Sequence, residues 1–311
     1  MNYPWIRVLK ICLFSKKTGR MMEIGGTGSS HLSITCKVNK YLCATKDSAE
    51  VRISNLTYGE VATIVTGQFY DVEIYAGYQN RSVPRIFKGG VLYASNALGD
   101  HKTNEVIILC ASNLVAKFGQ AKLSISLNSG INLYSAISFI MKRAGIPQTN
   151  ITNSLKNDII TQYNYNMKNA SAQNYLEYLQ DTYKDIEIST DSSEEAVINL
   201  ASSKFEDCKR FIKLDDKDIN LSGGYPRLTN AGLNVTIVPT LNVMPGQILK
   251  VNNSLIDISV RSQSEMQKSY GNYLDKDGMY KIFEMEYDLA NRASQFSLNL
   301  TCKSKTMVEG G

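Results

Sequence analysis

The sequence predicts a mainly β protein of the α+β class, in which a small α/β insert separates two β regions. Apolar and polar residues alternate in short segments near both ends of the chain, and Phe296 to Cys302 is the clearest of them. In the middle of the chain apolar residues recur instead at steps of three and four, which is typical of helices. Gly and Pro bound many of the alternating segments, as they do at strand ends.

A chain of 311 residues is long enough to form two domains with cores of their own. Its 43% of hydrophobic and 20% of charged residues are ordinary for a soluble globular protein and exclude global disorder. The net charge of +5 comes without a long block of either sign, which is too little to indicate a nucleic-acid-binding protein. The 18 tyrosines fit extensive protein contacts and a tyrosine-rich core equally well.

The N-terminal segment alternates as a strand from Ile6 to Leu13. Arg7 and Lys10 interrupt its apolar part, so we expect a strand here rather than a signal peptide. No segment approaches the run of about 18 apolar residues that a membrane helix requires. We therefore expect synthesis and assembly in the cytoplasm, without stable insertion into a membrane.

The six cysteines are expected to be reduced and mostly buried. They form no Cys-x-x-Cys pair, and their spacing fits neither a zinc site nor a thioredoxin-type site. These residues are Cys12, Cys36, Cys43, Cys110, Cys208 and Cys302. The sequence accordingly predicts no metal and no cofactor.

Strands are expected throughout the first third of the chain. Phe69 to Tyr78 alternates apolar and polar residues, and Gly77 marks its end. Two more strands follow in Arg85 to Ser95 and Asn104 to Ser112, and Gly89 with its neighbour Gly90 predicts a bulge or kink in the first of them. This pattern favours an antiparallel sheet with one solvated face.

The middle of the chain predicts two helices. The first, within Ile131 to Pro147, places Lys142 and Arg143 in its last turn, and the second, within Ser171 to Asp185, has Ser171 as its N-cap. Short strands follow at Ile186 to Ser189 and Ala196 to Leu200, so this part reads as a small α/β unit. The polar stretch Ser202 to Asn220 is the expected linker to the last β region.

The last third returns to alternation and contains a hairpin that has a counterpart earlier in the chain. Lys281 to Asn291 leads by a loop into Phe296 to Cys302, just as Arg85 to Asn96 leads into Glu105 to Cys110. Both pairs begin with a basic residue followed by Ile-Phe, and both end on a cysteine. The pattern indicates two copies of one β unit, although unrelated hairpins of similar composition can produce it by chance.

Three domains follow from these patterns. Residues 1–129 form a first β domain that includes an N-terminal hairpin region, residues 130–201 form the α/β insert, and residues 202–311 form a second β domain with a flexible C-terminal tail.

The segment Gly223 to Val251 combines a strand pattern with Pro and Gly at unusual places. Leu233, Val235 and Ile237 alternate with more polar residues, and Pro239 ends that strand because proline donates no backbone N–H. Pro245-Gly246 predicts a turn before the next strand. Nothing in the segment predicts a chemical site.

This segment resembles the second-domain signature of phage baseplate hub proteins, the family that includes late control protein D. In that signature a Gly-x-Pro-Arg start precedes Gly-Leu-x-Val and a Pro-x-Leu-x-x-x-Pro-Gly run. The matching positions are Gly224, Pro226, Arg227, Gly232, Leu233, Val235, Pro239, Leu241, Pro245 and Gly246. The first β region is also similar to the opening domain of the family, in the segments Arg52 to Thr57, Val72 to Tyr78 and Ile86 to Val91. The resemblance spans Val51 to Cys302.

The resemblance implies a structural virion protein of a contractile tail, in a phage or in a phage-derived injection machine. Two antiparallel β-barrel domains shaped like the tail-tube protein would let a homotrimer form a pseudo-sixfold ring. That ring would connect the hexameric tail tube to the trimeric central spike and form part of the channel through which DNA leaves. Further implied partners are other baseplate proteins and the tape measure protein.

The resemblance and the turn chemistry together give a set of structural or interface candidates. They are Gly77, Tyr78, Gly89, Gly224, Tyr225, Pro226, Arg227, Gly232, Pro239, Pro245 and Gly246. No catalytic, metal-binding or cofactor-binding residue is predicted.

Four patterns could suggest chemistry, and each has a simpler interpretation. Residues 25–30 are glycine-rich but lack the Lys-Ser/Thr of a phosphate loop, so the tip of a hairpin is favoured. Residues 273–280 lack the ligand spacing of a calcium loop, so a polar turn is favoured. Asp100 and His101 fall in a predicted loop without a nucleophile, and His31 is the only other histidine. Glu284 and Glu286 share a strand face, as solvated carboxylates often do.

The sequence therefore favours a non-enzymatic hub. Two alternatives stay open: a tail-associated cell-wall hydrolase that uses Glu284 or Glu286, and a stand-alone β-rich module that binds carbohydrate.

Overall fold

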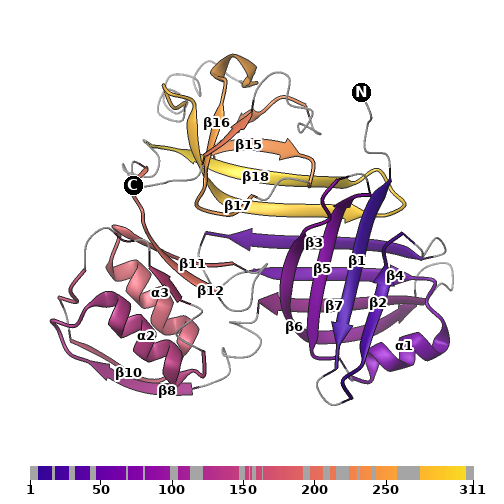
Figure 1. Cartoon of the computed structure of the whole chain (residues 1–311), viewed down its shortest axis with the longest axis horizontal. Coiled ribbons are helices and arrows are strands. Elements are labelled where there is room, and N and C mark those ends of the chain that lie inside the picture. The colour runs from indigo at the N-terminus through magenta and orange to yellow at the C-terminus, as the bar shows by residue number, and fades with distance from the viewer. Residues whose placement is uncertain are drawn as a thin grey trace.

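The structure is a computed structural model with a mainly β fold, as the sequence predicts (Figure 1). It describes residues 6–15, 18–27, 32–42, 47–67, 69–79, 81–98, 104–112, 122–146, 151–153, 155, 159–162, 164–191, 197–205, 211–214, 224–229, 232–239, 243–257 and 274–305. In this part of the chain no helix is long and apolar enough to cross a membrane.

The first β region supplies seven strands and one helix. In chain order these are β1 (Arg7–Phe14), β2 (Met21–Gly25), β3 (Ser33–Tyr41), β4 (Ser48–Ser54), α1 (Tyr58–Val65), β5 (Asp71–Tyr78), β6 (Arg85–Leu98) and β7 (Asn104–Ser112). Helix α1 was not expected from the sequence. It begins with a capping box, in which the Thr57 hydroxyl accepts from the Glu60 N–H while the Glu60 carboxylate accepts from the Thr57 N–H.

The middle of the chain forms the expected helices together with short strands. The elements are β8 (Lys122–Leu127), α2 (Leu133–Arg143), β9 (Ile151–Asn153), β10 (Tyr165–Ser171), α3 (Ala172–Thr182), β11 (Ile186–Asp191) and β12 (Val197–Ser202). Ser171 is the N-cap of α3, as predicted, since its side chain accepts from the Asn174 N–H. These elements enclose a core of their own, which draws on residues from Ile125 to Leu200.

The last β region completes the fold. Its elements are β13 (Phe211–Leu214), β14 (Arg227–Thr229), β15 (Gly232–Ile237), β16 (Ile248–Val251), η4 (Asn253–Leu255), β17 (Met279–Ala290) and β18 (Phe296–Ser304). Strand β13 lies within the stretch that was expected to be a linker, and it pairs in parallel with β16. A four-residue strand in polar surroundings leaves too short a pattern to be recognised in the sequence.

Both β regions belong to one hydrogen-bonded sheet of 13 strands. Its main path runs β14-β15-β18-β17-β3-β4-β7-β6-β5-β1-β2, so that β3 and β17 join the two regions (Figure 1). One hydrophobic core follows this sheet and contains residues from Leu9 to Cys302. The division at residues 129 and 201 stays a prediction, and the core of the insert already includes β8, which lies before residue 130.

Candidate assembly surface

A unit of five strands occurs twice in the large sheet. The first copy consists of β3 to β7, and the second copy consists of β14 to β18. The neighbours in the sheet are β3-β4-β7-β6-β5 in the first copy and β14-β15-β18-β17-β16 in the second. The two copies therefore have the same chain order and the same sheet order, which a pair of unrelated hairpins would not produce.

The strand registers agree residue by residue, with the two hairpin cysteines as the reference. Cys110 of β7 pairs with Ala49 of β4, and Cys302 of β18 pairs with Leu233 of β15. When Ala49 is aligned with Leu233, two residues further along each strand Val51 is aligned with Val235, and four residues further along Ile53 is aligned with Ile237. All four of these valine and isoleucine side chains are buried. The same apolar residues thus face the core at the same places in both copies.

A β-bulge interrupts each hairpin at the equivalent position. The register shifts between Val91 and Tyr93 in β6, next to the partner Cys110, and between Ile282 and Glu284 in β17, next to the partner Cys302. A bulge or kink was predicted at Gly89-Gly90. The bulge lies about two residues further along, because both glycines pair regularly with β7.

The hydrogen bonds beside the bulges also correspond. Val91 N–H donates to the Tyr70 carbonyl at 2.8 Å, and Ile282 N–H donates to the Gln247 carbonyl at 2.9 Å. Bulges bend and twist a strand at a fixed place. Both copies consequently bend the same strand in the same way.

The two copies differ in the connection that precedes their third strand. The first copy uses α1 there, whereas the second copy uses the Pro- and Gly-containing segment between β15 and β16. Pro239 is buried at its start, and Gly246, at a φ of 87°, donates its N–H to the Ile282 carbonyl at 2.8 Å. The described residues of this connection, 238–239 and 243–247, form no helix, and its Pro and Gly stand where the first copy has α1.

Two of the predicted glycines make close backbone contacts in the first copy. A Cβ atom at Gly77 would lie 2.3 Å from the Ser82 carbonyl oxygen, and one at Gly89 would lie 2.1 Å from the Ala111 carbonyl oxygen. Tyr78 is buried at the end of β5, and its ring meets that of Phe296 edge-to-face at 5.3 Å. These residues hold the sheet together rather than present a surface.

Five other candidates gather around β14, at one end of the main path of the sheet. Tyr225 is 69% exposed, Pro226 is buried, and Arg227 forms an ion pair with Asp257 at 3.7 Å. Gly224 is exposed at a φ of 92°. Gly232, at a φ of 128°, lies where a Cβ would come within 2.1 Å of the Cys302 carbonyl oxygen. Pro239, Pro245 and Gly246 lie apart from them, in the connection to β16.

The face of the sheet that points away from the core is rich in carboxylates between β17 and β7. Its acidic residues are Glu50, Glu105, Glu284, Glu286 and Asp288, and its basic residues are Lys37 and Arg52. Glu284 accepts a hydrogen bond from Tyr41, and burial together with this carboxylate raises the pKa of the Tyr41 hydroxyl. The face is negatively charged although the chain as a whole is basic.

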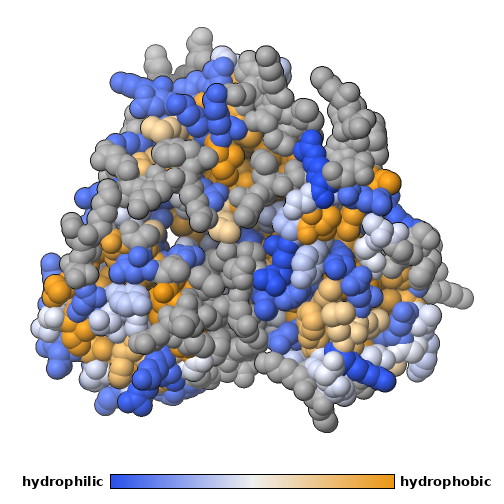
Figure 2. Space-filling view, in the orientation of Figure 1, coloured by the Kyte–Doolittle hydropathy of each residue, from blue (hydrophilic) through white to orange (hydrophobic). Residues whose placement is uncertain are grey.

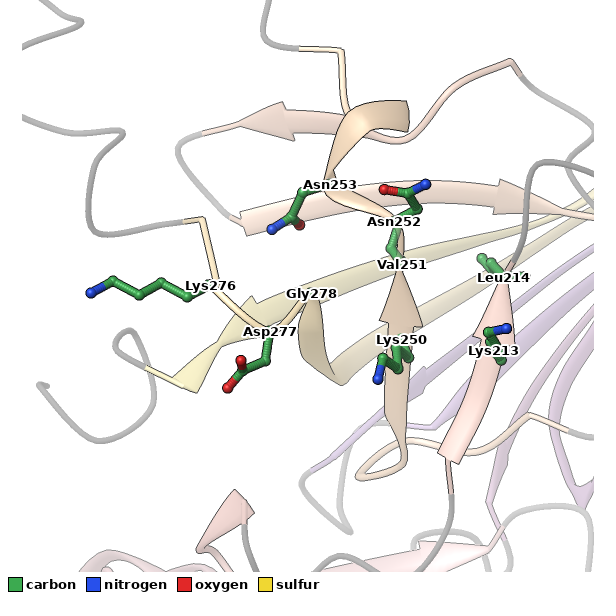
Figure 3. A pocket seen from close by; sticks show the side chains of 9 residues that line it. All are labelled: Lys213, Leu214, Lys250, Val251, Asn252, Asn253, Lys276, Asp277 and Gly278. Carbon is green, nitrogen blue, oxygen red and sulfur yellow. The ribbon is translucent and has the colours of Figure 1, made fainter.

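A pocket of about 360 Å³ lies where β13 and β16 end (Figure 3). It is lined by Lys213, Leu214, Lys250, Val251, Asn252, Asn253, Lys276, Asp277 and Gly278. Lys276 extends away from the two strands, and hydrophilic residues gather over this end of the sheet (Figures 2 and 3). Among the residues that line the pocket, the charged side chains are three lysines and one aspartate.

The turn beside this pocket is a polar β-turn, as predicted. Asp275 Oδ1 accepts from the Asp277 N–H at 2.9 Å and from the Met279 N–H at 3.1 Å. Within the described ranges no three His, Cys, Asp or Glu side chains are placed to hold a metal ion. His31, His101 and Asp100 lie outside the described residues, as do positions 28–30 of the glycine-rich stretch.

Comparisons with known proteins give a match in structure but not in sequence. No protein-family model matches the chain, and no curated protein matches it either. The tail protein from Neisseria meningitidis MC58 superimposes with a TM-score of 0.60 at 9% identity, covering 96% of this chain and 97% of that one. The 43 kDa tail protein of prophage MuSo2 from Shewanella oneidensis gives a TM-score of 0.58 at 10% identity, with 97% and 98% covered.

A type VI secretion protein has the same fold. It is the E. coli c3393 protein, a component of that system with structural similarity to the T4 bacteriophage tail proteins gp27 and gp5. Its superposition gives a TM-score of 0.58 at 10% identity and covers 87% of this chain and 73% of that one. The chain therefore has the fold of phage and type VI secretion tail proteins, and the resemblance to baseplate hub proteins that its sequence indicates is confirmed at the level of the fold.

Proposed function

We propose that this chain is a non-enzymatic structural subunit of a tail baseplate, a hub that forms a homotrimeric ring between the tail tube and the central spike. The observation that carries the proposal is the repeated unit of the large sheet. A tail protein with this fold and two copies of one unit can present six similar surfaces from only three chains.

The way in which the two copies meet favours a ring. The first copy contributes β3 and the second copy contributes β17 to the contact between them, so the contact joins different edges of the same unit. Such a head-to-tail contact can be repeated, and it closes into a ring when the rotation between successive units allows it. Six units would require three chains, which would match a hexameric tube on one side and a threefold spike on the other.

The charge of the exposed sheet face suits a channel through which DNA passes. Glu284, Glu286 and Asp288 alternate along β17. Among the described residues of β17, β3, β4 and β7, this face carries five carboxylates and two basic side chains, of which Arg52 is ion-paired with Glu50 and Glu105. Like charges repel the phosphate backbone, so a face of this kind would let DNA slide without binding it. We place this face toward the central channel of the ring, and DNA would contact it only in transit.

Native mass tests the proposal directly. Mass photometry of the purified chain, alone and mixed with the tube and spike proteins encoded near it, should show a species of three times 34.6 kDa, about 104 kDa, that also binds the spike. A chain that stays at 34.6 kDa in every mixture would overturn the hub. Release of peptidoglycan fragments that is lost in Glu284→Gln would establish the hydrolase instead, and a monomer that retains a sugar ligand would establish the carbohydrate-binding module.

A further inference from the structure

Within the described residues, the second half of β6 has one edge, the open edge, to which no strand is hydrogen-bonded, and helix α1 contacts β6 without pairing with it. In the described part of the chain β5 pairs with β6 only as far as Gly90, whereas β7 pairs with β6 up to Leu98. Ser112 of β7 donates its N–H to the Asp47 carbonyl, so the backbone N–H and C=O groups of Ser112 point toward β4. Along a strand these groups point to opposite sides at successive residues. Those of Leu109 and Ile107, three and five residues before Ser112, therefore point toward β6.

This alternation decides which backbone groups of β6 are turned outward. Tyr93 and Ser95, opposite Leu109 and Ile107, bond to β7. Ala94 and Asn96 therefore direct their N–H and C=O groups away from β7, toward the open edge. An unpaired strand edge of this kind is a template for another strand.

In the second copy the equivalent edge is covered by the chain itself. The residues of β17 from Glu284 to Ala290 pair with β3, and Tyr287, the counterpart of Asn96, pairs with Val38. Asp288, the counterpart of Ala97, lies opposite Lys37. The fold thus contains one complete example of the strand that this edge accepts.

The counterpart of β3 in the second copy is β14. Leu228 pairs with Leu233 as Val38 pairs with Ala49, so Leu228 corresponds to Val38 and Arg227 to Lys37. In the described part of the chain the outer edge of β14 meets a single residue. Asp257 donates its N–H to the Pro226 carbonyl at 2.7 Å and accepts from the Leu228 N–H at 3.2 Å.

We propose that β14 of one copy of this chain pairs with the open edge of β6 in a second copy, in the register that β3 keeps with β17. Leu228 then bonds to Asn96, and Arg227 lies opposite Ala97. In the single chain Asp257 is hydrogen-bonded to the outer edge of β14, and it leaves that edge when β6 of the second chain binds there. The inference rests on the proposed ring, and it names the edges through which that ring closes.

Engineered disulfides test the register. Arg227 and Ala97 would form a pair without mutual backbone hydrogen bonds, whose Cα atoms lie about 4.5 Å apart, within the range that a disulfide spans. The double variant Ala97→Cys/Arg227→Cys should form a covalent trimer on oxidation, seen at about three times the chain mass in a denaturing gel without reductant. The matched control Lys37→Cys/Asp288→Cys cross-links the equivalent pair inside one chain and should stay at the mass of a monomer.

Proline substitutions test the edge itself. Asn96→Pro removes an N–H that points outward, so the monomer should keep its fold while the trimer dissociates about tenfold more readily. Ser95→Pro removes an N–H that bonds to β7 and should instead destabilise the monomer.

The outcomes separate this interface from the hub. If the wild-type chain forms a trimer that binds tube and spike, but the double-cysteine variant gives no covalent trimer and Asn96→Pro changes nothing, the interface is wrong and the hub stands. If the covalent trimer forms and binds neither tube nor spike, the interface stands and the hub fails. A wild-type chain that is monomeric in every mixture overturns both.

Discussion

A buried ion pair joins the α/β insert to the large sheet, and removing one of its members should be costly. Lys281 of β17 is fully buried and contacts the carboxylate of Glu187 on β11, whose side chain is only 8% exposed. The same ammonium group donates to the Ser203 carbonyl at 3.1 Å. Burial raises the pKa of Glu187, and Lys281 lowers it in part.

Lys281→Met would keep the volume of the side chain and remove its charge. Glu187 would then be buried without a partner, and the Ser203 carbonyl would lose its donor. Breaking a buried pair in this way typically costs about 3–5 kcal/mol of the free energy of unfolding. The double variant Lys281→Met/Glu187→Leu removes both charges, and we expect it to regain most of the loss, because replacing a whole buried pair by apolar residues is often nearly neutral.

The loss should also depend on pH. A carboxyl group whose pKa is raised by folding favours the folded state at pH values below its unfolded pKa, and that contribution disappears as the pH rises through the folded pKa. Without Lys281 the pKa of Glu187 rises further, so the destabilisation should be large at pH 7 and smaller near the ordinary glutamate pKa of about 4.3.

Urea unfolding of the three proteins at both pH values provides the assay. A loss below about 1 kcal/mol at pH 7 in Lys281→Met would place the pair among weak, solvent-screened ion pairs and refute the reasoning. A double variant as unstable as the single one would show that packing, not charge, is responsible.

Three further predictions concern the core of the sheet. Val235→Asp should abolish folding, seen as loss of soluble protein and of the β signal in circular dichroism, because the side chain is 1% exposed and the new charge would have no partner. Gly89→Ala should lower the free energy of unfolding measured in urea, since a Cβ would meet the Ala111 carbonyl oxygen at 2.1 Å. Its control Gly59→Ala in α1 meets nothing within 4 Å and should raise the free energy of unfolding by about 0.5–1 kcal/mol. Equal effects of the two substitutions would contradict the steric argument. Burial raises the pKa of the Cys110 thiol to about 12, so peptide mapping should find Cys110 unalkylated at pH 8 in the native protein and alkylated in urea.

Local patterns in the sequence were sufficient for the long elements of the fold. The hairpins β6–β7 and β17–β18 and the helices α2 and α3 all lie where alternation or helical periodicity placed them. Helix α1 was missed because its eight residues give few apolar repeats, although Thr57 and Glu60 form a capping-box spacing that was available in the sequence.

The arrangement of the repeated unit could not be predicted in the same way. The two hairpins of similar sequence indicated it, but the single sheet depends on the pairing of β3 with β17, residues that are far apart in the chain. No local signal specifies such a pairing. Strand β14 has only three residues, which are too few to show a strand period, so Tyr225, Pro226 and Arg227 became candidates through the family resemblance and the conformational restriction that proline imposes.

The pairing of β3 with β17 also sets the order of events during synthesis. Tyr41 of β3 pairs with Glu284 of β17, so the ribosome must add more than 240 residues before the partner of β3 exists. At about 5–20 residues per second this takes about 10–50 s, during which one edge of the nascent first copy has no strand beside it. Lys37, exposed on β3, is the kind of charged residue that discourages edges from pairing with the wrong chain. The unpaired edge of β3 can therefore pair with another chain until β17 has been translated, and the risk of aggregation through this edge ends when β17 pairs with it.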